Sequence, residues 1–235
     1  SDAGVPRART GAVSASMPCM EEDPSALLGR LQAGAATPSW VDIAGYALEK
    51  VHTNVLAAAM RDPRKPEARR LAVALWNLST GAELQVEQVT DVWAGTEIAL
   101  KRGPNSRIDL LLRIAAAGRE YRLGVEAKVD TPPGGGQLAS MAEVVEQDEH
   151  ARLVLLALGA AQVARIERAD LTPRGLRRLT VADLLKLADL VEAASPAPDV
   201  ARAWRRALEL EDLRRRLAHF DEARLGGCGY RDRLL

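Results

Sequence analysis

Two apolar segments separated by a short loop constrain the fold of this chain more than any other feature. The first runs from Ser106 to Ile114, the second runs from Glu120 to Val129, and residues 116–118 (AAG) lie between them. Each segment is rich in Leu, Ile or Val and has the length of a strand. The pair therefore predicts a β-hairpin in the middle of a buried sheet.

Three charged residues interrupt these apolar segments. Asp109 lies in the first, and Glu126 and Lys128 occupy alternate positions in the second, which places them on one face of a strand. Charges among apolar strands are costly unless they are paired or bind a metal. Two carboxylates on adjacent strands suit Mg²⁺ or Mn²⁺, and a lysine beside them can orient a water or stabilise charge on a phosphate. The alternative for Glu-x-Lys alone is a solvated edge or an ion pair.

The remaining periodicity predicts helices before the hairpin and a mixture of helices and short strands after it. The expected helices cover about residues 24–31, 40–60, 66–78, 137–147, 180–190 and 200–217, and the other expected strands cover 96–101, 153–158 and 165–170. This order predicts one α/β domain over residues 23–220. A flexible segment is expected at residues 1–22 and a tail at residues 221–235.

Composition excludes several classes of protein. The chain has 32 basic and 32 acidic residues, so its zero formal net charge gives no overall attraction to nucleic acid, although a local patch can still bind one. Two cysteines exclude a disulfide scaffold. No apolar run reaches the ~18 residues of a membrane span, and no signal peptide is visible. We expect a cytoplasmic protein without a membrane partner.

The stretches TEIALKRGPNSRIDLLLRI, YRLGVEAKVD and GQLASM together resemble the core of the PD-(D/E)xK nuclease superfamily. In that family an Asp on the second core strand and a Glu-x-Lys on the third bind the metal and the water. The resemblance assigns these roles to Asp109, Glu126 and Lys128, with Ile108 in place of the Pro of the motif. It implies a restriction-endonuclease-like fold, a small mixed β-sheet flanked by α-helices, and hydrolysis of nucleic acid, DNA above all, with Mg²⁺ or Mn²⁺.

The same resemblance assigns two further residues. EKVHTNVLAAAMRDP resembles a family helix whose Glu joins the metal site, and that residue is Glu49. The sequence alone leaves Glu49 equally free to face inward or outward, and Glu97 is the competing carboxylate, which could instead pair with an arginine. Gln137 matches the Gln of a QxxxY motif and would shape the site, but Met141 takes the position of the Tyr.

Weaker signals concern contacts to nucleic acid. Arg102 and Arg107 flank the turn before Asp109, and Gly135 and Gly136 belong to a glycine-rich loop that can approach a phosphate backbone. Solvated turn charges are an equal alternative for the two arginines.

Other residues are expected to be structural. We expect His52 to have a packing or surface role, the four tryptophans to lie in the core, and the arginines of the last helix to form salt bridges at the surface.

The alternative function is a nuclease-like module that binds nucleic acid or a protein without cutting. The intact Asp109, Glu126 and Lys128 favour an enzyme, whereas the neutral net charge and the missing Tyr favour the binding module. Cleavage of both strands of a duplex would favour a homodimer.

Overall fold

The computed structural model of the protein describes residues 23–37, 39, 41, 49–99, 107–129, 141, 143, 148–159 and 176–225, with the backbone alone for 218–225. Several sequence predictions lie outside these ranges. They are the flexible segment 1–22, Trp40 with most of the first part of the helix expected at 40–60, Arg102, the glycine-rich loop with Gly135 and Gly136, Gln137 with most of the helix that it opens, the strand at 165–170, and the end of the tail.

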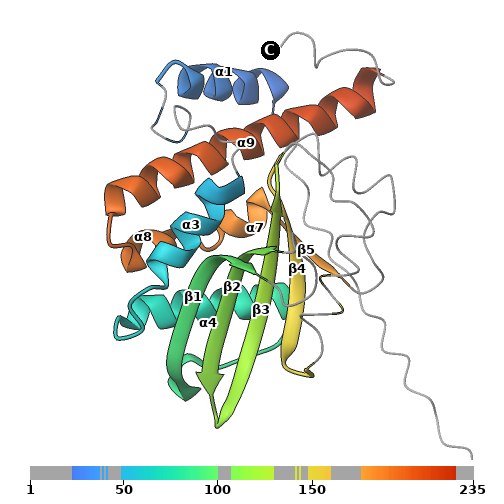
Figure 1. Ribbon diagram of the computed structural model, residues 1–235. Helices are drawn as coiled ribbons and strands as arrows, with labels where there is room; N and C mark the ends of the chain where they lie inside the picture. Colours follow the sequence, from blue (N-terminus) through green and yellow to red (C-terminus); the bar gives the residue numbers. More distant parts are fainter. Residues whose placement is uncertain are drawn as a thin grey trace, which may run out of the picture.

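In the described part of the chain, five strands form one mixed sheet in the order β1-β2-β3-β4-β5 (Figure 1). The strands are β1 (Val89–Ala99), β2 (Arg107–Ala116), β3 (Arg119–Lys128), β4 (Ala151–Ala157) and β5 (Arg177–Thr180). The first three form an antiparallel meander, and β4 and β5 continue the sheet parallel to β3. The predicted α/β class with a mixed sheet is confirmed.

The turn between β2 and β3 sets their register. Ala117 and Gly118 both have positive φ, 49° and 75°, as the two central residues of a type I′ hairpin turn do. This turn pairs Ala116 with Arg119 and carries the pairing along the strands as far as Leu110 with Val125. Local turn geometry therefore decides which residues of the two strands lie opposite each other.

Helices flank the sheet. They are α1 (Pro24–Ala35), α3 (Glu49–Ala59), α4 (Pro66–Thr80), the 3₁₀ turn η1 (Val86–Gln88), α7 (Val181–Leu185), α8 (Ala188–Ala194) and α9 (Pro198–Leu225). None of the described helices combines the length and the hydropathy needed to cross a membrane.

Three boundaries differ from the sequence predictions. The single helix expected at 180–190 is two short helices, α7 and α8. Strand β1 begins at Val89 because its first half pairs with the end of β2, a long-range interaction that periodicity does not reveal. Helix α9 continues to Leu225, past the expected end at Leu217 and into the expected tail.

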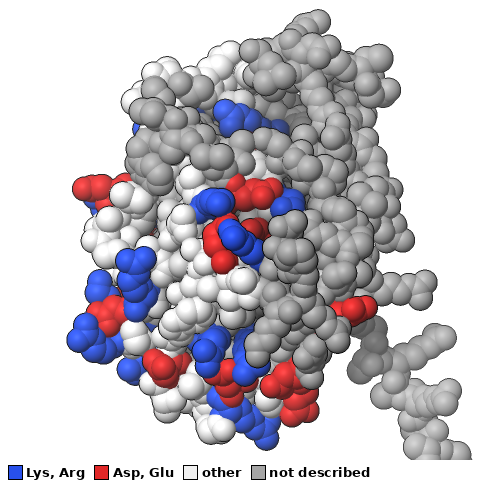
Figure 2. Space-filling model, in the orientation of Figure 1, with Lys and Arg blue, Asp and Glu red and all other residues white. Residues whose placement is uncertain are grey.

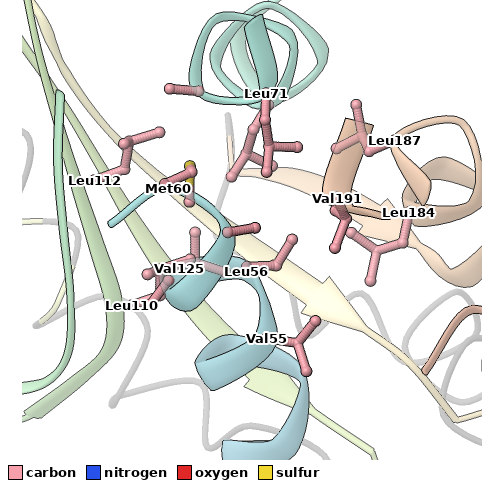
Figure 3. Packing of buried hydrophobic residues seen from close by; sticks show 14 of the residues in the cluster. Val55, Leu56, Met60, Leu71, Leu110, Leu112, Val125, Leu184, Leu187 and Val191 are labelled. Atoms are coloured by element: carbon pink, nitrogen blue, oxygen red, sulfur yellow. The ribbon is translucent and has the colours of Figure 1, made fainter. Parts of the chain in front are cut away.

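The main core lies between one face of the sheet and the helices. Figure 3 shows buried side chains that come from the sheet (Leu110, Leu112, Val125), from α3 and the residue after it (Val55, Leu56, Met60), from α4 (Leu71) and from α7 and α8 with their junction (Leu184, Leu187, Val191). Because side chains alternate along a strand, the residues between the core positions of β3, including Glu126, turn toward the opposite face of the sheet. The packing of the core thus decides the face on which the charged residues lie.

Candidate active site

Asp109 and Glu126 come from neighbouring strands. The backbone pairing of β2 with β3 ends at Leu110 with Val125, and Asp109 and Glu126 are the next residues of the two strands. Their carboxyl groups lie close enough for each to shift the pKa of the other. The carboxylate of Asp109 accepts a hydrogen bond of 2.8 Å from the backbone N–H of Ala127. The Asp109 side chain therefore satisfies a backbone donor of β3 at the end of the ladder, which holds this carboxylate beside Glu126.

Lys128 links the strand carboxylates to helix α3. Its ammonium Nζ lies 2.9 Å from Oε1 of Glu126 and 3.2 Å from Oε2 of Glu49, the first residue of α3. Only 2% of the Glu126 side chain and 12% of the Lys128 side chain are exposed, against 30% for Glu49. Glu49 therefore faces the sheet, and the orientation that the sequence left open is decided by the packing of α3.

Burial and charge shift the pKa values of the site. Burial, and then the negative charge of Asp109, raise the pKa of Glu126 to about 7, although the hydrogen bond from Lys128 lowers it. Burial also raises the pKa of Asp109 above its usual value, against the opposing effects of the Ala127 N–H and the Lys128 charge. Two carboxyl groups that resist ionisation together are typical of a functional site or of a cation-binding site.

The pKa of Lys128 moves in the opposite sense to that expected from burial alone. Burial would lower it, but the hydrogen bonds to Glu126 and Glu49 and their negative charges outweigh that effect, and the pKa is raised. Lys128 is therefore a protonated hydrogen-bond donor at neutral pH. It can orient a water or stabilise an anion, and it cannot accept a proton.

Glu97 borders the site without joining the carboxylate pair. Its carboxylate lies 3.4 Å from Nζ of Lys50 and 3.5 Å from Nη1 of Arg107. Its charge nevertheless contributes to the raised pKa of Asp109. Glu97 has a positive φ of 54°, a conformation that costs an ordinary residue about 1–2 kcal/mol. Glu97 thus pairs with an arginine and also lies near the site, so both interpretations of this residue apply in part.

Lys50 is a residue near the site that no sequence pattern indicated. It follows Glu49 directly, and its ion pair with Glu97 connects α3 to the edge strand β1. Lysine is rare in this chain, and that rarity was the one available signal.

A buried hydrogen bond fixes the helix that carries Glu49. The indole Nε1 of Trp204 on α9 donates to Nδ1 of His52 on α3 over 3.1 Å, and both side chains are fully buried. The packing role expected for His52 is confirmed. Since His52 lies one helical turn after Glu49, this bond positions the N-terminal turn of α3 against the end of β3.

The donor set fits a divalent cation only in part. Among the described residues, no group of three or more His, Cys, Asp or Glu side chains is arranged to hold a metal ion. The ammonium of Lys128 lies against both Glu49 and Glu126, so the three predicted ligands do not form one cluster. Asp109 and Glu126 are the pair that fits, because a hard cation prefers carboxylate oxygens and would relieve the repulsion between these two.

The remaining predicted residues have mixed outcomes. Arg107 is exposed and pairs with Glu97, so its solvated and its phosphate-binding interpretations both stay open. Met141 is buried against Ile108 and Leu153, which makes it a packing residue.

Trp76 and Trp204 are buried as expected, but the expectation for Trp93 is wrong, since 44% of this residue is exposed. Trp93 lies on the edge strand, at a position that turns away from the main core.

Comparisons of the chain with family models, with curated proteins and with solved structures found no match. A function for this protein therefore has to be inferred from the geometry of the site.

Proposed function

We propose that this protein is a Mg²⁺-dependent nuclease of the PD-(D/E)xK type, with a restriction-endonuclease-like domain, that hydrolyses phosphodiester bonds of DNA. One observation carries the proposal. Asp109, Glu126 and Lys128 converge at one end of the sheet, and Glu49 reaches the same place from a helix far away in the sequence. These are the residues that the sequence resemblance assigned to the site.

Asp109 and Glu126 would hold the cation. When bound, Mg²⁺ supplies positive charge that stabilises the negative charge developing on the phosphate. In the hydrolysis, a water oxygen bonds to phosphorus, one P–O ester bond breaks, and the water proton leaves to solvent or to the departing oxygen.

Lys128 would orient the attacking water and donate a hydrogen bond to the phosphate. Its raised pKa keeps it charged for this role. Glu49 and Glu126 hold the ammonium in place from two sides. Glu49 therefore acts chiefly through Lys128, and its predicted role as a metal ligand is secondary in this arrangement.

A second function is favoured by one observation. The ion pairs of Lys128 offset part of the negative charge of Glu49 and Glu126, and the described residues contain no ready cluster of three ligands. A module that binds nucleic acid without cutting would have this property.

Cleavage of supercoiled plasmid and of single-stranded DNA separates the two functions. The assay compares Mg²⁺, Mn²⁺ and EDTA with the wild type, Asp109→Asn and Lys128→Ala. Lys186→Ala is the matched control, because Lys186 also forms an ion pair with a carboxylate but lies on the exposed surface near α7. A nuclease cuts only with metal and loses activity in the first two variants. Absence of metal-dependent cutting, together with absence of Mn²⁺ binding, would support the non-catalytic module.

A further inference from the structure

The face of the sheet that carries Asp109 and Glu126 continues toward the hairpin between β2 and β3. Arg122 lies an even number of residues before Glu126 on β3, so the two side chains share a face, and Arg113 shares it because Arg113 is paired with Arg122. The pairing of the strands puts Arg113 opposite Arg122 and Trp93 opposite Arg113. These three residues, named here the Trp–Arg row, lie side by side across β1, β2 and β3.

The side chains of the Trp–Arg row are exposed. Trp93 is 44% exposed, and the side chains of Arg113 and Arg122 are 47% and 49% exposed. The guanidinium of Arg113 lies over the Trp93 ring, 5.9 Å from its centroid. An exposed indole beside two cations is typical of a binding surface rather than of a folding core.

Glu120 holds the two arginines in place. Its carboxylate accepts hydrogen bonds of 3.0 Å from Nε of Arg113 and 2.5 Å from Nε of Arg122. Each guanidinium has five N–H donors, so this exposed contact leaves donors that can bind a phosphate. Arg113, Arg122 and Glu120 together carry a net positive charge.

Between the Trp–Arg row and the carboxylates, β1 and β3 each carry a glycine. Gly124 on β3 and Gly95 on β1 both lie opposite Leu111 of β2, so the strands beside it carry no side chain at this level. The indole of Trp93 leans over Gly95, where an added Cβ would lie only 2.5 Å from the ring. Gly95 therefore lets the ring lie along the strand in the direction of the site.

Figure 2 shows the same arrangement on the surface. One group of acidic and basic side chains gathers where α3 begins, a second gathers near the β2–β3 hairpin, and mainly uncharged surface lies between them. Along the strands, the Trp–Arg row and the carboxylate pair are separated by about 13 Å, a span that a few nucleotides can bridge.

We propose that the Trp–Arg row binds a single-stranded part of the nucleic acid whose backbone is cut at Asp109 and Glu126, an inference that rests on the proposed function. The indole stacks on an unpaired base, and Arg113 and Arg122 bind the adjacent phosphates. A base within a duplex is already stacked on both sides and offers no free face to the indole. The row therefore selects ends, flaps or open strands over an intact duplex.

Binding measured by fluorescence anisotropy tests this inference. The probes are a labelled oligothymidine and a duplex of the same length, and the protein is Asp109→Asn in EDTA, which prevents cutting. We expect tighter binding to the single strand. Trp93→Ala should weaken that binding about tenfold, because the stacked base loses its aromatic partner, and Trp93→Phe should retain part of it.

The arginines are tested by the dependence of affinity on salt. Removing two phosphate contacts, in the variant Arg113→Ala/Arg122→Ala, should reduce the slope of log K against log salt by about 1.4 units on a single strand. The matched control is Arg202→Ala/Arg205→Ala, because these arginines of α9 are also exposed and paired with carboxylates. Thermal unfolding of each variant verifies that it is folded.

Three results would overturn the inference. They are unchanged affinity in the Trp–Arg variants, equal loss in the α9 control, and binding by the Asp109→Asn protein with an intact row that is absent or tighter to the duplex. The cleavage assay keeps this inference separate from the proposed function. If the row variants cut single strands as the wild type does while Asp109→Asn is inactive, the binding role of the Trp–Arg row is wrong and the nuclease function is supported. If the row variants lose binding but neither they nor the wild type cut DNA, the binding role of the row is supported and the proposed nuclease function is wrong.

Discussion

The ammonium of Lys128 lies 2.9 Å from Oε1 of Glu126, at a place where only 2% of the Glu126 side chain is exposed to solvent. Isolated buried charges are unfavourable, and this ion pair offsets part of that cost. The pair does not remove the effect of burial, because the pKa of Glu126 is still raised to about 7. The burial of Glu126 therefore lowers the stability of the folded protein, and such a loss of stability is typical of functional sites.

Stability should fall as pH rises through the range in which Glu126 ionises. The folded protein keeps the Glu126 proton up to about pH 7, whereas the unfolded chain loses it near 4.5, so the folded state binds more protons between these values. This residue should lower the free energy of unfolding by about 3 kcal/mol across that window.

Urea denaturation in EDTA at a series of pH values measures this effect. The variant Glu126→Gln should lose that part of the pH dependence and be the more stable protein at pH 8. Glu120→Gln is the control with the opposite sign, because hydrogen bonds from Arg113 and Arg122 lower the pKa of Glu120. Parallel profiles for wild type and Glu126→Gln would contradict the assignment.

Lys128→Ala should separate metal binding from catalysis. The Lys128 ammonium competes with a divalent cation for Glu126 and Glu49, so its removal should leave Mn²⁺ affinity unchanged or raise it. Cleavage should nevertheless fall about 100-fold, the size of effect seen when a donor to a developing anion is removed. Mn²⁺ titration by electron paramagnetic resonance and the rate of plasmid nicking measure the two quantities. Loss of both together would mean that Lys128 supports the fold of the site rather than the reaction.

Asp109→Asn should weaken Mn²⁺ binding by at least about tenfold. The amide can still accept the hydrogen bond from Ala127, so the fold of the strand ends should be kept. Glu97→Gln is the control, since Glu97 pairs with Lys50 and Arg107 and should change the affinity less. An equal loss in both variants would instead indicate a general effect of negative charge near the site.

His52→Ala should lower the free energy of unfolding by about 1–3 kcal/mol, because the buried Nε1–H of Trp204 loses its acceptor. His52→Asn supplies an amide oxygen and should recover part of the loss. His150→Ala is the comparison at a histidine of the sheet region that is 22% exposed, and it should have a smaller effect. Urea denaturation measures all three variants, and an unchanged midpoint in His52→Ala would contradict the role given to this bond.

Ala117→Asn should stabilise the protein by about 0.5–1 kcal/mol. Ala117 has a positive φ of 49° at the first central position of the hairpin turn, where Asn is strongly preferred before Gly. The midpoint of thermal unfolding should rise, whereas Ala115→Asn, within β2, should lower it. A lower midpoint for Ala117→Asn would mean that the turn does not adopt the I′ geometry in solution.

Much of the fold follows from local patterns in the sequence. The alternation of apolar residues located β2 and β3, and it put Glu126 and Lys128 on one strand face. Pro66 and Gly81 delimit α4 as helix-start and helix-stop residues do. These signals are local, because the period of side chains and the conformational limits of Pro and Gly depend only on nearby residues.

The tertiary structure decided which side chains meet. Glu49 faces Lys128 because α3 packs against the sheet and His52 bonds to Trp204 on a distant helix. Trp93 is exposed because β1 lies at the edge of the sheet, which no period in its sequence reveals. The residues of the candidate site were therefore identifiable from the chain alone, whereas the use of Lys128 as a bridge between Glu49 and Glu126 depends on contacts between elements far apart in sequence.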